Sequence, residues 1–340
     1  RQLYDKPYLR HLFLELTLKC NEHCFHCGSN CTSIAGEELT LEEYKDIIDQ
    51  IKEDFGTKGI YLCITGGEPL LRPDWFDIMM YAHEQGFHWG MTSNATLITK
   101  EVAHQLAVSG MKTISVSIDG LPDTHDRLRG YKGGYEQAMR GIQNLIDENA
   151  FDHIQVTTVF NHENLKERDE LFEIMKGIDI DSWRVTNLEP IGRALLSPNL
   201  MCTKEDYVTM FDFIRDKRRQ GYPVIYGCTH YLGDEYEGTV RDWIWTCSAG
   251  ILTGSIMANG DIGACLDIER RPETIQGNIR HDRFKDVWEN RFELFRQPLD
   301  QLSPICKGCA HAYECRGDSY HSYNYDKMAP MVCMKGTLFD

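Results

Sequence analysis

The sequence predicts an α/β fold: a partial (β/α)6 TIM-like barrel, followed by a cysteine-rich, loop-rich domain that starts from a β-hairpin. Two observations support this prediction. In the first half of the chain, short runs rich in Val, Ile, Phe and Thr alternate with longer stretches whose apolar residues recur at helical spacing. In the second half the alternation stops and cysteines accumulate. Repeated strand–helix–strand units imply a parallel sheet, and six such units suit a partial barrel.

Each element of the predicted barrel is a segment of this pattern. The six buried runs expected to be strands are residues 12–18, 60–65, 87–92, 113–118, 154–160 and 183–188. The amphipathic stretches expected to be helices are residues 41–53, 75–85, 100–109, 135–148, 164–176 and 204–219. Thr40 and Thr99 stand directly before two of these stretches and are predicted N-caps.

The second half of the chain begins differently. Residues 251–258 and 261–266 flank Asn259-Gly260, a pair that favours a tight primed turn, so they predict a hairpin. The cysteine-dense tail that follows is of a kind that metal usually stabilises. We therefore expect a core at residues 1–220, a connector at 221–245 and a second domain at 246–340.

Composition excludes several classes of protein. Thirty-six Lys and Arg against 52 Asp and Glu give a net charge of −16, which disfavours nucleic acid as the main partner. Neither a long apolar segment nor an export signal is present, so we expect a cytoplasmic protein without membrane contact. In that reducing compartment the 13 cysteines indicate metal binding or catalysis rather than disulfides.

The first cysteine group follows the first predicted strand. Cys20, Cys24 and Cys27 form a CxxxCxxC motif whose thiolates can converge on one soft metal centre. Three protein ligands would leave an iron of a 4Fe–4S cluster open for a substrate or cosubstrate. Cys31 can add a fourth thiolate, which would give a zinc loop or a fully ligated electron-transfer cluster. The spacing alone leaves both alternatives open.

Polar groups also follow the next three strands. Gly66-Gly67-Glu68-Pro69 follows the second strand, Ser93-Asn94 ends the third, and Ser117-Ile118-Asp119-Gly120 ends the fourth. Glycines allow a ligand to approach the backbone closely, and Glu68 can accept from an ammonium group. A barrel presents its active site at the carboxyl ends of its strands, so together these groups predict a ligand site there.

These motifs, in this order, resemble the radical SAM superfamily over about residues 9–220. His26 fills a slot before the last motif cysteine that is usually aromatic, and Ser93-Asn94 fills the usual TN slot. The resemblance implies that Cys20, Cys24 and Cys27 hold a 4Fe–4S cluster whose fourth iron chelates S-adenosylmethionine. It implies further cofactor contacts from the strand ends and neighbouring main chain: His26, Gly66, Gly67, Glu68, Pro69, Ser93, Asn94, Ser117, Arg129 and Leu188. Arg127 competes with Arg129 for the cofactor carboxylate, and both can instead be solvated helix residues. Cys31 is then a surplus thiol.

The chemistry implied by the resemblance is reductive cleavage of S-adenosylmethionine. An electron donor such as flavodoxin or ferredoxin reduces the cluster, and a 5′-deoxyadenosyl radical then abstracts a hydrogen atom from the substrate.

The second cysteine group resembles the SPASM domain, which carries auxiliary 4Fe–4S clusters. Six of the seven usual cysteines are present: Cys247, Cys265, Cys306, Cys309, Cys315 and Cys333. Ser319 stands at the seventh position. The resemblance implies one complete cluster at Cys306, Cys309, Cys315 and Cys333, and a doubtful second one at Cys247 and Cys265 that can borrow Cys228 or Ser319. A twitch-like arrangement would instead use Cys247, Cys265, Cys306 and Cys309, and zinc is the remaining alternative.

Relatives with SPASM domains mostly modify peptides or proteins, so we expect a peptide maturase that crosslinks, oxidises or epimerises a ribosomal peptide. Leu266, where sulfatase-maturing members have an acid, lowers the sulfatase alternative. Because the resemblance starts at about residue 9, we expect no leader-binding module before the core, so a separate protein would capture the peptide. A small metabolite or haem precursor is the second hypothesis, and a non-catalytic iron–sulfur or zinc scaffold is the third.

Other polar residues fit no motif. Cys202 or Cys228 can return a hydrogen atom to a substrate radical, although a buried thiol in apolar surroundings is the simpler interpretation. A base can come from a set of loop residues that we expect to be solvated: His230, Asp234, Glu235, Asp267 and Glu269. Four aromatic residues can line a peptide groove or pack the domain junction: Tyr231, Tyr236, Trp243 and Trp245.

Overall fold

The computed structural model describes residues 2–34, 36–242 and 246–339. Its main sheet has ten strands in the order β10-β9-β8-β1-β2-β3-β4-β5-β6-β7. The strands of this sheet are β1 His11–Glu15, β2 Tyr61–Thr65, β3 His88–Ser93, β4 Met111–Ser117, β5 His153–Phe160, β6 Ser182–Asn187, β7 Val224–Tyr226, β8 Thr253–Ile256, β9 Asp261–Gly263 and β10 Gly277–Asn278. Two further short strands, β11 Tyr323–Asn324 and β12 Ala329–Pro330, pair with each other in the tail.

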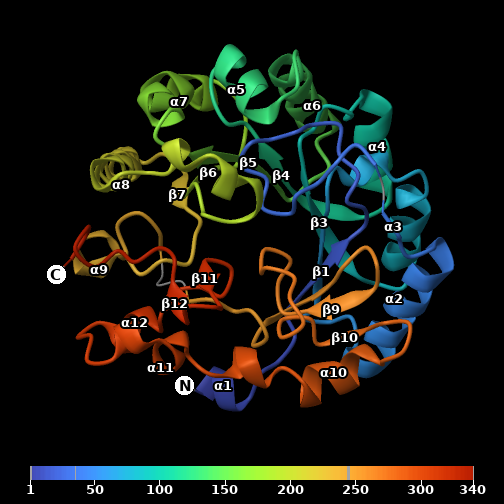
Figure 1. Cartoon of the computed structure of the whole chain (residues 1–340). Helices are drawn as coiled ribbons and strands as arrows, with labels where there is room; N and C mark the ends of the chain where they lie inside the picture. The colour runs from blue at the N-terminus through green and yellow to red at the C-terminus, as the bar shows by residue number, and fades with distance from the viewer. Residues whose placement is uncertain (1, 35, 243–245, 340) are drawn as a thin grey trace.

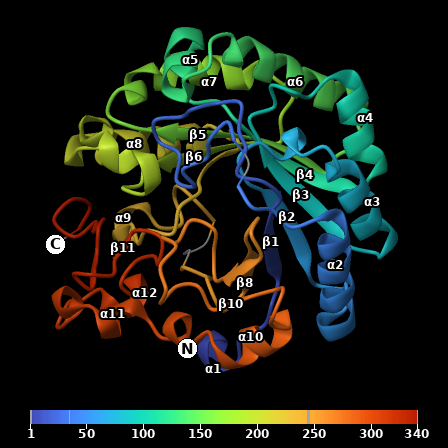
Figure 2. The same ribbon diagram turned by 45° about the vertical axis from the view of Figure 1, so that its right-hand side comes forward.

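Helices α2 to α8 form an arc on the outer side of the sheet, and the C-terminal tail lies on the opposite side beside α1 (Figures 1 and 2). The helices are α1 Gln2–Asp5, α2 Leu41–Phe55, α3 Trp75–Glu84, α4 Lys100–Val108, α5 Pro122–Arg129, α6 Gly134–Glu148, α7 Arg168–Lys176, α8 Lys204–Arg219, α9 Gly233–Tyr236, α10 Phe284–Asn290, α11 Leu299–Leu302 and α12 Ala312–Cys315. None of the described helices is long and apolar enough to span a lipid bilayer.

The six predicted strands are present and parallel, which confirms the barrel, but the sheet continues beyond both ends of the predicted set. Strand β7, within the segment expected to be a connector, pairs in parallel with β6. At the other end β8 pairs in parallel with β1, with Leu12 opposite Gly254. The hairpin of the second half is therefore hydrogen-bonded to the first strand of the barrel.

The hairpin itself is confirmed, but its turn is not primed. Gly260 has φ +91, whereas Asn259 is not among the residues with positive φ, which a type I′ turn needs at both central positions. The Gly260 N–H donates to the Met257 carbonyl instead, at 2.8 Å. The glycine thus acts after the turn, where the chain re-enters β9.

Local interactions position the outer helices as the sequence predicts. The Thr40 side chain accepts from the Glu43 N–H in a complete capping box, and the Thr99 side chain accepts from the Val102 N–H. The apolar faces of these helices pack into one core cluster that also contains Phe284 of α10. The core therefore extends from the barrel into the second half of the chain.

Candidate functional site

The CxxxCxxC motif lies in a loop that leaves β1 and crosses to α5. The N–H groups of His23 and Phe25 donate to the carbonyls of Arg129 and Leu128, each at 2.9 Å. At the start of the loop, Cys20 N–H donates to the Thr32 carbonyl at 2.7 Å. Backbone hydrogen bonds thus hold the start and the middle of the motif.

The segment that contains Gly192 and Arg193 also contacts this loop. The Arg193 side chain donates to the Cys24 carbonyl at 2.7 Å and also to the Cys31 carbonyl. Gly192, at φ +54, lies so close that a Cβ there would be 2.3 Å from the Cys27 carbonyl oxygen. Only glycine fits this contact.

The glycine pair after β2 packs directly against the backbone that precedes Cys20. Gly67 N–H donates to the Thr17 carbonyl at 2.7 Å, and Glu68 N–H donates to the Lys19 carbonyl at 2.9 Å. A Cβ on Gly66 would be 2.2 Å from the Thr17 oxygen, and one on Gly67 would be 2.1 Å from the Lys19 oxygen. The two glycines therefore set the position of the cysteine loop, a role that the sequence did not predict.

Glu68 joins the ends of β2 and β3. Its fully buried carboxylate accepts from Ser93 Oγ at 2.9 Å and from the Asn94 N–H at 2.8 Å. Asn94 in turn donates from Nδ2 to the Asn21 Oδ1 within the cysteine loop at 2.9 Å. Burial raises the pKa of Glu68 to about 7. The structure thus brings together the polar groups predicted from the first three strand ends.

Arg129, which the sequence left equal to Arg127, is buried in an ionic network beside the loop. Its guanidinium donates to Asp119 at 2.9 Å and pairs with Glu22, whereas Arg127 is exposed and pairs with Glu163 on the surface. His26 Nε2 lies 3.1 Å from the Asp119 carboxylate. The alternative of a solvated helix residue is therefore wrong for Arg129.

Electrostatics in this network follow from burial and from the Arg129 charge. Burial alone would raise the pKa of the Asp119 carboxyl, but Arg129 and His26 hold it well below its usual range. Two buried polar atoms of the network, Glu22 Oε1 and His26 Nδ1, have no hydrogen-bond partner among the described residues. Such atoms suit a polar ligand that lies against the loop.

The remaining predicted contact residues lie around the same end of the barrel. Pro69 is buried and opens a short 3₁₀ turn, Pro69–Leu71. Ser117 ends β4 and lies opposite Thr157 of β5. Leu188 directly follows β6, is buried, and donates its N–H to the Phe160 carbonyl at 2.7 Å.

Cys31 is buried against the motif and is not a loose thiol. It donates to the Gly66 carbonyl at 3.5 Å. The Cys31 side chain is also the main reason why the pKa of Cys27 falls to about 5, and Cys27 in turn raises the pKa of Cys31. The site thus has three motif thiols with a fourth held beside one of them.

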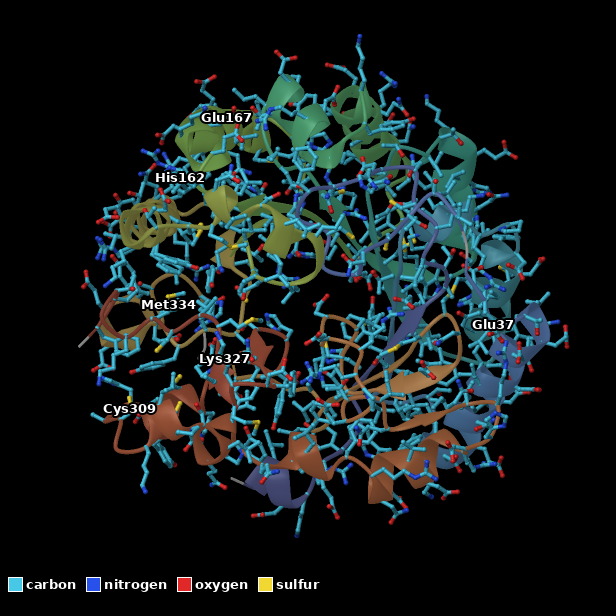
Figure 3. All side chains as sticks on the ribbon, in the orientation of Figure 1. Glu37, His162, Glu167, Cys309, Lys327 and Met334 are labelled. Atoms are coloured by element: carbon cyan, nitrogen blue, oxygen red, sulfur yellow. The ribbon has the colours of Figure 1, made fainter. Side chains whose placement is uncertain are left out.

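Four cysteines of the tail line one pocket: Cys306, Cys309, Cys315 and Cys333. Cys309 lies next to α12 in the tail (Figure 3). Cys247 and Cys265 do not line this pocket and pack at the edge of the apolar core instead. Ser319 is fully buried, and its Oγ lies 2.7 Å from the Ser322 Oγ. The structure thus brings together the four cysteines for which the sequence predicted one complete cluster, and which residues bind the auxiliary clusters stays a prediction.

The sequence interpretation was wrong for His230 and incomplete for Cys228. His230 is fully buried between the carboxylates of Glu189 and Asp318, not a solvated loop residue. Cys228 is buried in the apolar core, as expected, but its thiol also donates to the Glu189 carboxylate at 3.6 Å, which the sequence did not predict. No local pattern marks this cluster, because it combines three segments that are far apart in the chain: Glu189, Cys228 with His230, and Asp318.

The other unassigned residues lie as expected. Cys202 is half-buried and donates to the Phe160 carbonyl at 3.6 Å. The acidic loop residues Asp234, Glu235, Asp267 and Glu269 are exposed. Tyr231 packs against Phe339, and Tyr236 packs against Phe211, so both fill junctions. Trp243 and Trp245 lie outside the described residues.

Comparison with known proteins identifies the family. The Radical SAM superfamily profile matches residues 14–175, and the profile of the SPASM iron-sulfur cluster-binding domain matches residues 247–310. AdoMet-dependent heme synthase from Methanosarcina barkeri is 30% identical over 333 residues, covering 89% of this chain and 92% of the synthase. The chain belongs to the radical SAM superfamily. This radical SAM enzyme is also 30% identical to mycofactocin maturase MftC from Mycobacterium tuberculosis, over 89% of this chain and 76% of the maturase.

Solved structures share the fold of this radical SAM enzyme. Streptococcus suis SuiB bound to S-adenosylmethionine superposes with a TM-score of 0.73 at 19% identity, over 92% of this chain and 73% of SuiB. Membership of the family brings a 4Fe–4S cluster, S-adenosylmethionine and auxiliary iron–sulfur clusters as cofactors. The donor set fits them, since three thiols share one braced loop and four more line one pocket. An enzyme of this family is not a non-catalytic scaffold, the third hypothesis from the sequence.

Proposed function

We propose that this radical SAM enzyme abstracts hydrogen from a peptide or protein, in the maturation of a ribosomal peptide. The observation that carries the proposal is an apolar rim on the two segments that frame the cysteine loop. It consists of four exposed side chains: Phe25, 41% exposed; Ile34, 76%; Leu195, 57%; and Leu196, 82%.

The rim lies beside the metal-binding loop because its two segments are tied together. Phe25 and Ile34 belong to or follow the loop, and Leu195 and Leu196 follow Arg193, whose side chain donates to the loop carbonyls. Small-molecule sites are concave and enclose most of the ligand. Large apolar side chains left exposed beside an active site instead suit a partner that extends beyond the pocket, as a peptide does.

The residues take the following roles in the proposal. Cys20, Cys24 and Cys27 hold the 4Fe–4S cluster, and Cys306, Cys309, Cys315 and Cys333 hold one auxiliary cluster. When bound, the cluster and S-adenosylmethionine supply a 5′-deoxyadenosyl radical that removes a hydrogen atom from the substrate. The chain itself fixes the loop through the glycine pair, and it orients polar groups through Glu68 and Arg129.

A second candidate function is the conversion of a haem precursor. It is favoured by the coverage of the Methanosarcina barkeri heme synthase, of which this chain matches 92%, against 76% of the maturase. For either reaction we propose a flavodoxin or ferredoxin as the electron donor, and a cytoplasmic location. Peptide capture by a separate leader-binding protein belongs to the first candidate only.

The experiment compares substrates and rim variants. Anaerobically reconstituted enzyme is incubated with S-adenosylmethionine, reductant and either candidate precursor peptides or iron-free and iron-loaded porphyrins. Formation of 5′-deoxyadenosine and the product mass are measured. We expect peptide-dependent 5′-deoxyadenosine, with a peptide two mass units lighter for a crosslink or oxidation and of unchanged mass for an epimer.

Leu196→Asp should raise the KM for the peptide and leave cleavage of S-adenosylmethionine without peptide unchanged. The matched control is Val208→Asp, because Val208 is an apolar side chain on α8 that is itself 38% exposed. Turnover of porphyrin alone would overturn the first candidate, as would equal effects of the two variants.

A further inference from the structure

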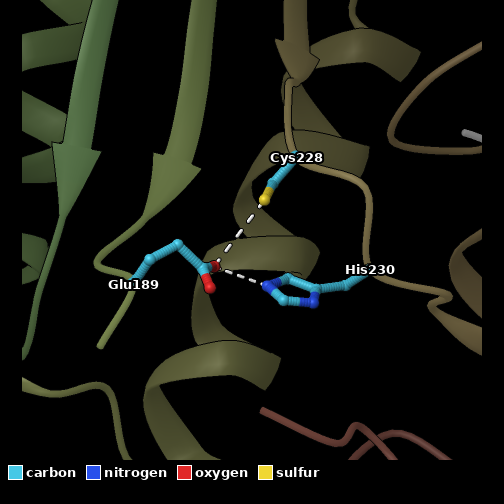
Figure 4. A group of neighbouring side chains, drawn as sticks. All are labelled: Glu189, Cys228 and His230. Atoms are coloured by element: carbon cyan, nitrogen blue, oxygen red, sulfur yellow. Dashed lines mark hydrogen bonds and ion pairs between the residues drawn. The ribbon is translucent and has the colours of Figure 1, made fainter. Parts of the chain in front are cut away.

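A buried group of donor atoms lies outside the cysteine motifs. Glu189 follows the end of β6, Cys228 follows β7, and His230 lies two residues further on (Figure 4). Their ligand atoms all lie within 4.8 Å of one another. The Glu189 carboxylate lies between the other two side chains, with Oε1 3.6 Å from Cys228 Sγ and 2.5 Å from His230 Nε2.

A fourth donor comes from the C-terminal tail. His321 Nε2 lies 4.0 Å from Cys228 Sγ and 3.9 Å from Glu189 Oε2. All four side chains are shielded from solvent: His230 is fully buried, Cys228 is 8% exposed, and the side chains of Glu189 and His321 are 10% and 15% exposed. One thiol, two imidazoles and one carboxylate therefore converge at the junction of barrel and tail.

We propose that Glu189, Cys228, His230 and His321 bind one zinc ion, separate from the iron–sulfur clusters. The donor set is one that Zn²⁺ favours. A tetrahedral zinc with bonds of about 2.0–2.3 Å keeps the ligand atoms of this set about 3.3–3.6 Å apart. The distance of 3.6 Å between Cys228 Sγ and Glu189 Oε1 already has this value. The distances from His321 Nε2 to Cys228 Sγ and to Glu189 Oε2 exceed it by only about 0.5 Å.

The surroundings of the group support a metal site independently of the donor set. Asp318 places both carboxylate oxygens 2.8 Å from His230 Nδ1. A carboxylate that accepts from one ring nitrogen and leaves the other facing the metal is the usual support of a ligating histidine. Arg241 holds the loop that carries two of the ligands, because it donates to the carbonyls of Cys228 and His230.

Glu189 also carries an oxygen without a hydrogen-bond partner among the described residues. Its Oε2 is buried and accepts no hydrogen bond within the described parts of the chain, and a buried carboxylate oxygen left in that state is costly. A cation at the centre of the group would satisfy it. Zinc binding would replace the hydrogen bond between His230 Nε2 and Glu189 Oε1, and these two atoms would move about 1 Å further apart. The proton of the Cys228 thiol and the proton shared by His230 and Glu189 would be released to solvent.

Because all four ligands come from the protein, the ion is structural and ties the ends of β6 and β7 to the tail. The test is zinc analysis of the anaerobically purified, iron-loaded enzyme. We expect one zinc per chain, and zinc-edge X-ray absorption with one sulfur at about 2.3 Å and three lighter neighbours at about 2.0–2.1 Å. This measurement needs no variant, and absorption at the zinc edge does not detect the iron of the clusters. Enzyme that binds no zinc when one equivalent is added, or zinc without a sulfur neighbour, would overturn the proposal.

Variants identify the ligands. Cys228→Ser should remove the sulfur neighbour and weaken zinc binding at least about tenfold, and Asp318→Asn should weaken it about 10–100-fold. Iron content should stay constant in both. The matched control is Cys202→Ser, a half-buried thiol that belongs to neither the cysteine motifs nor the proposed zinc site, and it should change neither metal. Loss of iron from the Cys228 variant would assign this thiol to an auxiliary cluster and refute the zinc site.

Discussion

Gly67→Ala tests whether the glycine pair positions the cysteine loop. The new Cβ would lie 2.1 Å from the Lys19 carbonyl oxygen, and the atoms must separate to at least 3.0 Å, so the backbone next to Cys20 has to retreat by about 0.9 Å. That movement also breaks the hydrogen bonds from Gly67 and Glu68 to the loop, each worth about 1 kcal/mol. A displacement of about 1 Å at reacting groups costs roughly 100-fold in rate.

The measurement is the rate of 5′-deoxyadenosine formation in anaerobic enzyme of known iron content. We expect Gly67→Ala to retain iron in the tail and to lose about 100-fold in rate. The control is Gly36→Ala, because a Cβ at Gly36 meets no atom within 4 Å. If the Gly67 variant is as fast as the control, the backbones at Gly67 and Lys19 are not in the close contact described, and the glycine pair does not position the cysteine loop.

Three further predictions concern the same site. Cys27→Ala should abolish 5′-deoxyadenosine formation, whereas Cys31→Ala should keep more than about a tenth of it, because the Cys31 thiol donates to the Gly66 carbonyl and is not one of the three proposed ligands. Equal loss of activity and of iron in both variants would favour a four-cysteine centre. Arg129→Ala should lower the free energy of unfolding by about 3–5 kcal/mol, because it leaves the buried Glu22 carboxylate without its cation and leaves Asp119 with His26 alone. Replacement of the exposed Arg127 by Ala should lower it by less than about 1 kcal/mol, and urea unfolding of both proteins checks the difference. Burial raises the pKa of Glu68 from 4.5 to about 7, so the folded state keeps a proton that the unfolded chain has lost, and stability should fall as pH rises through this window. Glu68→Gln should remove up to about 3 kcal/mol of that fall, and an unchanged pH profile would contradict the assignment.

The barrel was predictable because its signals are local. Thr40 and Thr99 mark helix starts through contacts three residues away, and each buried strand shows its own apolar run. The positions of Gly67, Glu68 and Ser93 followed from strand order, since parallel strands place their carboxyl ends together. Strand β7 was missed because three residues, Val224–Tyr226, give too short a run to be recognised.

Other parts of the site depend on contacts between distant segments. Glu189, His230 and Asp318 form one hydrogen-bonded group, but they come from the ends of two strands and from the tail. The sequence neighbours of His230 are typical of a loop, and His230 becomes buried only when the distant segments come together. Arg129 and Arg127 are likewise equivalent in sequence, and they differ because α5 turns one toward Glu22 and the other toward solvent.

The parallel pairing of β1 with β8 has a consequence during synthesis. Leu12 pairs with Gly254, which the ribosome adds 242 residues later. At about 5–20 residues per second, one edge of β1 has no neighbour for roughly 12–48 s after it emerges. An unpaired strand edge can recruit other chains. A nascent chain of this enzyme should therefore depend on chaperones until its own hairpin arrives, and truncation before residue 253 should give aggregates rather than a free barrel.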